Sequence, residues 1–213
     1  MLARRVLVLG LSAMLLSFFP IATADDTLQA ASPLTDGVST NGYVCYDDGC
    51  SPTDEVDWWK ISAYKGDIVQ IGFSGSMNNG FPLVGDGWEA DFSIHDSTGS
   101  QISGQSMSDS SSSASLSTTM SGAGWIYVKI KGKDSWFNDG VDYTLTPSLN
   151  QDNRDTDEDG FVDNDDDCDD LVGTSTNDRN GCTDTDGDGW SDSDSGWGVQ
   201  NGADAFVLDP TQW

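Results

Sequence analysis

Alternating aspartates in the last third of the chain constrain its fold more than any other feature. Carboxylates at every second position, with nothing apolar between them, cannot build a helix stripe or a half-buried strand. They do suit a cation, because Ca²⁺ takes roughly six to eight oxygen ligands and a glycine turn lets successive carboxylates converge on one ion. The run comprises Asp155, Asp157, Asp159, Asp163 and Asp166, with Gly160 after the third aspartate and Cys168 at its end.

The pattern occurs a second time, which argues against a chance arrangement. Asp184, Asp186, Asp188 and Asp192 repeat the spacing, and Gly189 stands at the turn. Residues 151–213 hold 19 acidic side chains and 2 basic ones, a net charge of −17. Close carboxylates repel each other by up to about 4 kcal/mol per pair before salt screening. We expect this segment to stay open until divalent ions neutralise it; an acidic, disordered tail is the plain alternative.

The N-terminus has the pattern of a secretory signal peptide. Arg4 and Arg5 precede an uncharged run, and Ala22-Thr23-Ala24 suits a small-residue cleavage site. We expect residues 1–24 to be removed and the mature chain to be soluble and exported. A retained membrane anchor is the alternative.

Four cysteines, an even number, fit an oxidising compartment. Cys45 lies close in sequence to Cys50, and Cys168 to Cys182, so we expect these two local disulfides. A zinc site is the competing interpretation, but the chain has one histidine and no Cys-x-x-Cys spacing.

Residues 25–149 carry the period-two alternation of an all-β domain, with turn-forming residues between the alternating runs. The inward positions are expected at Val69, Ile71 and Phe73, at Phe92 and Ile94, at Ile126, Val128 and Ile130, and at Val141, Tyr143 and Leu145. About 120 residues in short strands can close a sandwich core. The serine-rich stretch 103–121 within this domain is weakly patterned. In it, Leu116, Thr118 and Met120 suit an edge strand, and residues 110–113 suit a mobile loop.

Motifs between residues 40 and 148 resemble bacterial pre-peptidase C-terminal domains. The segment Asp54-Glu55-Val56-Asp57-Trp58-Trp59-Lys60-Ile61, followed by Lys65-Gly66-Asp67, resembles that family's D-x-D-W strand and its turn. Segment 90–99 resembles its strand ending in a D-x-x-G turn, and segments 124–130 and 142–146 its two closing strands. The resemblance implies a jelly-roll-like β-sandwich, found beside secreted enzymes and without catalysis of its own.

The tail, residues 150–213, resembles the thrombospondin type 3 repeat. Its first copy fits D-x-D-x-D-G-x-x-D-x-x-D-x-C at every signature position. In that family aspartates wrap calcium ions, regular secondary structure is scarce and disulfides tie the repeats together. The resemblance implies an irregular, calcium-stabilised, Asp-rich tail, with calcium ligands at Asp155, Asp157, Asp159, Asp163, Asp166, Asp184, Asp186, Asp188 and Asp192.

The second copy departs from the pattern at its end. Ser195 stands where the next aspartate belongs, and Trp197 where the cysteine would be, so Asp194, Asp204 or Asp209 could substitute. Dockerins and paired EF-hands share the D-x-D-x-D-G loop. A dockerin loop leads into an apolar-striped helix, however, whereas this first loop leads into further aspartates, and the bidentate glutamate of an EF-hand is missing.

Catalysis finds little support in the sequence. The single histidine, His95, is expected to face solvent, and no G-x-S-x-G motif is present. The tryptophans are expected mainly in the core, although Trp88 and Trp136 could form a sugar-stacking platform; the others considered are Trp58, Trp59 and Trp125. The negative charge argues against nucleic acid, since phosphate binding needs the opposite sign.

These features predict an exported, non-enzymatic calcium-binding protein of structural or adhesion type, located outside the cell or at its surface. A β-sandwich interaction module would stand on a calcium-stiffened spacer. Its partners would be Ca²⁺ and an extracellular protein or glycan, with no stable membrane insertion after signal cleavage. The alternatives are a carbohydrate-binding module and an accessory region of a larger secreted hydrolase.

Overall fold

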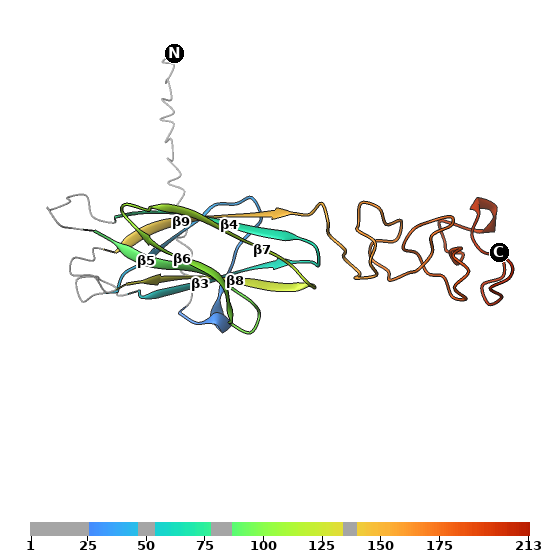
Figure 1. Cartoon of the computed structure of the whole chain (residues 1–213), viewed down its shortest axis with the longest axis horizontal. Helices are drawn as coiled ribbons and strands as arrows, with labels where there is room; N and C mark the ends of the chain where they lie inside the picture. The colour runs from blue at the N-terminus through green and yellow to red at the C-terminus, as the bar shows by residue number, and fades with distance from the viewer. Residues whose placement is uncertain (1–25, 47–53, 78–86, 134–139) are drawn as a thin grey trace, which may run out of the picture.

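A β-sandwich followed by an elongated tail makes up the computed structural model, which describes residues 26–46, 54–77, 87–133 and 140–213 (Figure 1). The expected signal peptide, Cys50 and Trp136 lie outside these ranges. The described strands are β1 (Ser32–Pro33), β2 (Thr40–Val44), β3 (Val56–Ala63), β4 (Ile68–Met77), β5 (Glu89–His95), β6 (Gln101–Ser108), β7 (Ser113–Thr119), β8 (Gly124–Gly132) and β9 (Val141–Asn150). Two short 3-10 helices are η1 (Leu28–Ala30) and η2 (Val199–Asn201).

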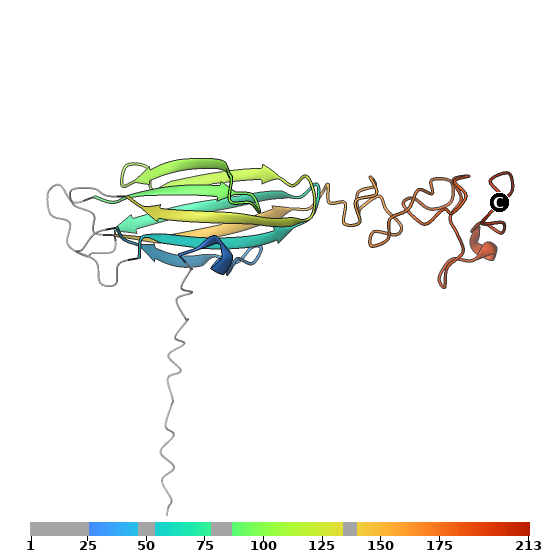
Figure 2. The ribbon, with the colours of Figure 1, turned by 90° about the horizontal axis from the view of Figure 1, so that it is seen from below.

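The strands form two sheets that pack face to face, as Figure 2 shows from below. One sheet has the order β1-β3-β8-β5-β6 and the other β2-β9-β4-β7. Neighbouring strands are antiparallel except for the parallel pair β1 and β3. The expected all-β sandwich is confirmed. Within the described ranges, no helix has the length and apolar character needed to cross a membrane.

The core consists of the inward positions that the alternation predicts. The buried members include Val69, Ile71 and Phe73 of β4, Phe92 and Ile94 of β5, Ile126, Val128 and Ile130 of β8, and Val141, Tyr143 and Leu145 of β9. Because side chains on a strand alternate between its two faces, each run delivers its apolar residues to the space between the sheets.

The expectation that His95 faces solvent is wrong. The residue is 7% exposed, although it lies on the outer face of β5. Its Nε2 lies 2.9 Å from Ser93 Oγ and its Nδ1 lies 3.0 Å from the Gly99 carbonyl oxygen. The Trp58 ring of β3 covers it, with the ring centroids 5.0 Å apart. Burial lowers the pKa of His95. The large Trp58 side chain, two strands away in the same sheet, therefore covers a position that alternation assigned to water.

Two tryptophans show where the structure agrees with expectation and where it differs. Trp88 is buried in the core beside Phe73, with ring centroids 6.3 Å apart, as expected for most of the tryptophans, and the alternative of an exposed sugar platform does not apply to it. Trp125, expected in the core, is 42% exposed on the outer face of β8, where the Lys60 ammonium lies 5.2 Å from its ring centroid.

The serine-rich stretch forms one edge of each sheet. β6, which the sequence did not predict, lies at the edge of the five-stranded sheet, and β7 lies at the edge of the four-stranded sheet as expected. Between them Ser108 and Ser111 exchange two backbone hydrogen bonds, so part of the expected loop is a tight turn. The exposed, polar side chains of these two strands make each of these edges less prone to pair with another sheet.

One polar network interrupts the apolar core. Trp59 Nε1 donates to Tyr143 Oη over 2.8 Å, and Tyr143 Oη donates in turn to Asp57 Oδ2. All three residues are buried, and Asp57 Oδ1 has no hydrogen-bond partner among the described residues. Burial raises the pKa of Asp57 to about 7, and the hydrogen bond from Tyr143 opposes this shift. Folding therefore favours the neutral form of the Asp57 carboxyl group over the charged form.

We predict that Asp57 makes the sandwich less stable as pH rises. Its folded pKa lies above the unfolded value of 3.8, so its contribution is fully present below about pH 4 and is lost as pH rises through about 7. Asp57→Asn should gain stability relative to the parent by at most about 4 kcal/mol between pH 4 and pH 8, at about 1.4 kcal/mol per pKa unit. Urea unfolding at fixed calcium across this range measures it.

The matched control is Glu55→Gln, which removes a carboxylate from an exposed position two residues away. Its free energy of unfolding should run parallel to that of the parent protein over the whole pH range. A parallel curve for Asp57→Asn as well would contradict the prediction.

Candidate metal centre

The tail contains two loops built in the same way, residues 155–163 and 184–192, offset by 29 positions (184 − 155). In each loop the backbone N–H of the last aspartate closes the turn. Asp163 N–H donates to the Arg154 carbonyl and Asp192 N–H to the Thr183 carbonyl, both over 2.7 Å. The expected irregular backbone is observed, since between the end of β9 and η2 the tail has turns and bends in place of helices and strands.

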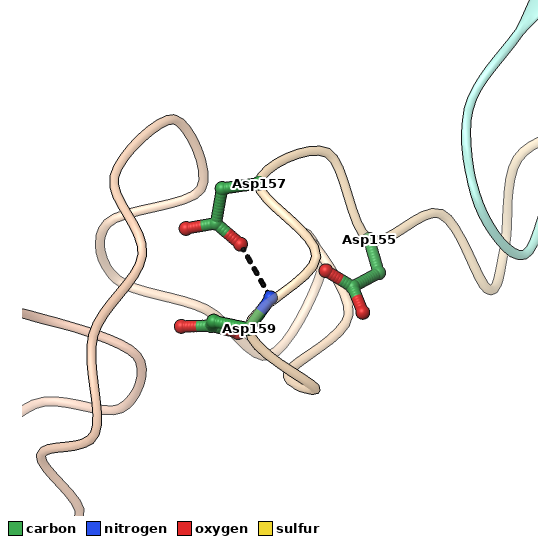
Figure 3. Close-up of side chains that lie close together, drawn as sticks. All are labelled: Asp155, Asp157 and Asp159. Atoms are coloured by element: carbon green, nitrogen blue, oxygen red, sulfur yellow. Dashed lines mark hydrogen bonds between the residues drawn. The ribbon is translucent and has the colours of Figure 1, made fainter. Parts of the chain in front are cut away.

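Each loop brings three carboxylates together. One oxygen from each of Asp155, Asp157 and Asp159 lies within 4.8 Å of the others (Figure 3). Asp184, Asp186 and Asp188 form the matching group in the second loop. This separation suits oxygens that share one cation. The structure thus brings together the first three predicted ligands of each repeat.

Backbone hydrogen bonds aim these carboxylates. Asp157 Oδ1 accepts from Asp159 N–H over 3.1 Å, as Figure 3 shows, and Asp186 Oδ1 accepts from Asp188 N–H over 3.3 Å. In both cases Oδ2 is buried and has no hydrogen-bond partner. One oxygen of each side chain therefore holds the turn, and the other is left for a ligand.

The turns require backbone conformations that glycine adopts readily. Gly160 has φ +108° and Gly189 has φ +94° at equivalent positions. Two residues earlier in each loop, Gly187 has φ +80°, whereas the first loop has Glu158 at φ +66°. Glu158 is the only described non-glycine residue with positive φ, so the first loop has the more strained backbone at this position.

The fourth predicted ligand of each repeat bonds to its own loop. Asp163 accepts hydrogen bonds from the backbone N–H and the hydroxyl of Thr156, over 2.7 and 2.8 Å. Asp192 makes the same pair of bonds with Thr185, over 3.1 and 2.6 Å. Each of these aspartates holds the end of its loop against the beginning. The only sequence signal for this contact is the threonine at the second position of each loop.

Electrostatic contacts place a fifth carboxylate near each cluster. Burial raises the pKa of Asp166, and the charges of Asp159 and Asp157 raise it further. Burial likewise raises the pKa of Asp186, with added contributions from Asp188, Asp204 and Asp184. Asp166 therefore neighbours the first cluster, as predicted, and Asp204 neighbours the second.

Of the three substitutes considered for the second loop, Asp204 fits best. It is 1% exposed, and its Oδ2 has no partner among the described residues. Asp194 instead pairs with Arg179 over 2.7 Å and accepts backbone bonds from Gly196 and Trp197. Asp209 caps the turn at Thr211.

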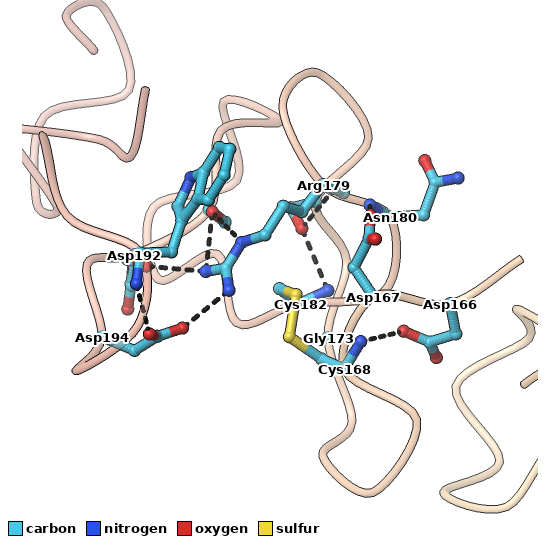
Figure 4. Close-up of a disulfide and its surroundings, with 12 residues drawn as sticks. Asp166, Asp167, Cys168, Gly173, Arg179, Asn180, Cys182, Asp192 and Asp194 are labelled. Carbon is cyan, nitrogen blue, oxygen red and sulfur yellow. Dashed lines mark hydrogen bonds and ion pairs between the residues drawn. A yellow bond between two sulfur atoms is a disulfide. The ribbon is translucent and has the colours of Figure 1, made fainter. Parts of the chain in front are cut away.

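A disulfide lies between the two loops. Cys168 and Cys182 are bonded, as predicted (Figure 4). Cys45 is also disulfide-bonded, while its predicted partner Cys50 falls outside the described ranges. Beside the Cys168–Cys182 bridge, the Arg179 guanidinium donates to Ser191 Oγ and to the Asp192 carbonyl, which ties the second loop to the bridge.

Comparisons with known proteins give similarity at the level of architecture alone. No family model matches the sequence, and no curated protein matches it. Among solved structures, the pre-peptidase C-terminal domain of a collagenase from Bacillus anthracis is 12% identical, with 55% of this chain and 94% of that chain covered and a TM-score of 0.38. PliG of Aeromonas hydrophila, a periplasmic inhibitor of g-type lysozyme, is 12% identical, with 56% and 96% covered and a TM-score of 0.37.

A CBM4 structure is 11% identical, with 45% of this chain and 61% of that chain covered and a TM-score of 0.32. At these identities and TM-scores the matches assign neither family nor function. The geometry of the two loops is therefore the evidence for a metal site.

We predict that Asp204 and Asp194 differ in their effect on calcium binding. Asp204→Asn should weaken calcium binding to the second loop by about tenfold or more, because it neutralises a buried carboxylate beside the cluster. Asp194→Asn removes an equal charge from an exposed ion pair and should change the affinity less than threefold. Calorimetric titration of both variants with Ca²⁺ decides between them. Equal losses would show that Asp204 is not part of the site.

Proposed function

We propose that this protein is an exported, non-enzymatic calcium-binding protein in which the β-sandwich is the interaction module and the tail is a calcium-stiffened spacer. The observation that carries the proposal is a set of buried carboxylate oxygens without hydrogen-bond partners. They belong to Asp155, Asp157, Asp186, Asp188 and Asp204. Every one of these residues belongs to, or neighbours, one of the two clusters.

Two of these aspartates are almost completely buried. Asp155 is only 5% exposed, and Asp204 only 1%. An ionised carboxylate taken out of water is costly unless a cation or hydrogen-bond donors compensate it. Three such groups within 4.8 Å would add their mutual repulsion. A bound cation offsets both costs at once.

The donor set favours Ca²⁺ among the common metal ions. All the candidate ligands are carboxylate oxygens, which hard cations prefer, whereas zinc sites are built from thiolate and imidazole. The described cysteines are disulfide-bonded, and His95 is buried within the sandwich. Mg²⁺ demands tighter octahedral geometry and should substitute poorly.

The tail depends on such ions because it has almost no apolar core. Among residues 151–213, the only buried apolar side chains are Cys182 and Ala203. The free energy of metal binding is then also the free energy of folding, since the loops have little else to hold their shape. Neutralising a segment of net charge −17 would turn a self-repelling coil into a stiff spacer.

Export accords with the disulfide bonds, which persist in oxidising compartments. Calcium is also plentiful outside the cell, where loops of modest affinity would be filled. The proposal therefore places the protein outside the cell or at its surface, with no role for nucleic acid.

We predict that the full chain takes up at least two Ca²⁺ ions and becomes more compact. Asp157→Asn should remove one site and Asp186→Asn the other, each lowering the affinity of its own loop by more than tenfold. Calorimetry counts the ions, and small-angle scattering measures the compaction. No uptake at millimolar calcium would sink the proposal, and equally tight binding of Mg²⁺ would contradict the assignment of the ion.

A sugar ligand for the sandwich is a second candidate, favoured by a groove of about 420 Å³ on the outer face of β2, β9 and β4. Its lining includes hydroxyl and amide side chains, namely Asn41, Tyr43, Ser74, Ser76 and Thr144, together with Asp142. Such groups match the hydrogen-bonding pattern of a neutral saccharide.

If the groove binds sugar, Thr144→Arg should abolish binding to a panel of neutral oligosaccharides, because it fills the groove. Thr146→Arg, two residues along the same strand and outside the groove, should leave binding intact. Affinity electrophoresis compares the two variants. Absence of binding by the parent protein would remove this candidate.

A further inference from the structure

The first calcium loop is not self-contained, and the difference from the second loop is visible at its first aspartate. Both oxygens of Asp184 accept backbone N–H groups of their own loop, from Gly187 over 2.8 Å and from Gly189 over 2.9 Å. Asp155, at the equivalent position, has Oδ1 unpaired and Oδ2 bonded to Lys65 Nζ over 2.5 Å. Its orienting donor thus comes from the sandwich, 90 residues away in the sequence.

Lys65 belongs to the turn between β3 and β4, and this turn contacts the tail along its backbone. Asp155 N–H donates to the Lys65 carbonyl over 3.0 Å, which forms an isolated β-bridge. A side chain on Gly66 would lie 1.6 Å from the Asn153 carbonyl oxygen, so the two backbones meet where only glycine fits. Gly66 also has φ +82°. The turn is shaped to receive the start of the tail.

Two further contacts hold the first loop against the sandwich. The Arg154 guanidinium makes two hydrogen bonds with the buried Asp67 carboxylate, over 3.0 and 2.9 Å. Glu158 Oε1 accepts the Ala123 N–H over 2.9 Å. Such paired bonds to a buried carboxylate are strong and directional. Arg154 is also part of the loop closure, because its carbonyl accepts the Asp163 N–H.

We propose that Lys65 is a positioning residue for the first calcium loop, so that calcium binding there locks the tail onto the sandwich. This inference rests on the proposed calcium function. Lys65 holds the Asp155 carboxylate through Oδ2, and the buried Oδ1 is left without a hydrogen-bond partner. A calcium ion that binds Oδ1 then stabilises the same arrangement that joins the two modules. The second loop lacks any such contact among the described residues and binds calcium independently of the sandwich.

The charge of Lys65 acts against a nearby cation, and two effects therefore compete. The Lys65 side chain is 35% exposed, so water and salt screen its repulsion of the ion. Its hydrogen bond to a ligand carboxylate is the kind of outer contact whose loss costs a metal site about tenfold or more in affinity. The positioning effect dominates.

The test titrates the full chain with Ca²⁺ while one loop is silenced. In an Asp186→Asn background, which leaves the first loop, Lys65→Met should weaken calcium binding by about tenfold. Lys65→Arg keeps a charged donor and should restore most of the affinity. In an Asp157→Asn background, which leaves the second loop, Lys65→Met should have no effect. Lys131→Met, the same change at an exposed lysine of β8, is the matched control in both backgrounds.

A second measurement follows from reciprocity, because calcium must stabilise the docked state by the same factor by which docking strengthens calcium binding. In the Asp186→Asn background, millimolar calcium should raise the midpoint of sandwich unfolding, followed by the circular dichroism of the β-strands, all of which precede the tail. Lys65→Met should abolish most of that rise. Lys65→Gln replaces Lys65→Met in both assays if the latter does not fold.

The outcomes separate this inference from the proposed function. If the unsubstituted chain binds no calcium, the proposed function fails. If it binds calcium but Lys65→Met leaves the first loop unchanged or tighter, only the role of Lys65 is overturned. A tenfold loss of calcium affinity confined to the first loop, with rescue by Lys65→Arg, supports the proposal that calcium binding there locks the tail onto the sandwich.

Discussion

Mutual repulsion of aspartates held close together is the constraint on which the tail depends. The tail holds two groups of three carboxylates, and within each group one oxygen per side chain lies within 4.8 Å of the others. The same segment has only two buried apolar side chains among its described residues. Hydrophobic burial cannot hold such a segment together, because there is little apolar area to remove from water. A cross-link and short backbone turns supply part of the order, and the rest requires positive charge.

The sandwich is held together by the opposite means. Its two sheets bury a continuous set of apolar side chains, with aromatic rings such as Phe73, Phe92 and Tyr143 in contact. The buried Asp57 is an exception, since Tyr143 satisfies one of its oxygens and leaves the other unpaired. A carboxyl group in this position costs least when it is neutral. The sandwich is therefore stabilised by apolar burial, whereas the tail has almost none.

These two kinds of stability meet at the turn between β3 and β4. There, positive charges on both sides of the joint face aspartates on the other: Lys65 of the sandwich meets Asp155, and Arg154 of the tail meets Asp67. In a chain with 9 basic residues against 36 acidic ones, this use of two cations at one contact is notable. It gives an acidic tail a defined attachment to an acidic domain, with opposite charges in contact.

Sequence alone determined the features that depend on local spacing. The period of two predicted which side chains of β4, β8 and β9 form the core, and the aspartate spacing predicted the two clusters and their glycine turns. The local disulfide between Cys168 and Cys182 followed from proximity in the chain. Each of these needs only neighbouring residues, so the pattern carries the information.

Tertiary structure decided whatever depends on residues distant in sequence. Trp58 on β3 buries His95 on β5, and Trp88 turns into the core. Asp204, and neither Asp194 nor Asp209, neighbours the second cluster, because Arg179 and local turns engage the other two. The contact of Lys65 with Asp155 joins positions 90 residues apart. Spacing along a chain specifies a loop, but packing in three dimensions determines which charge lies beside it.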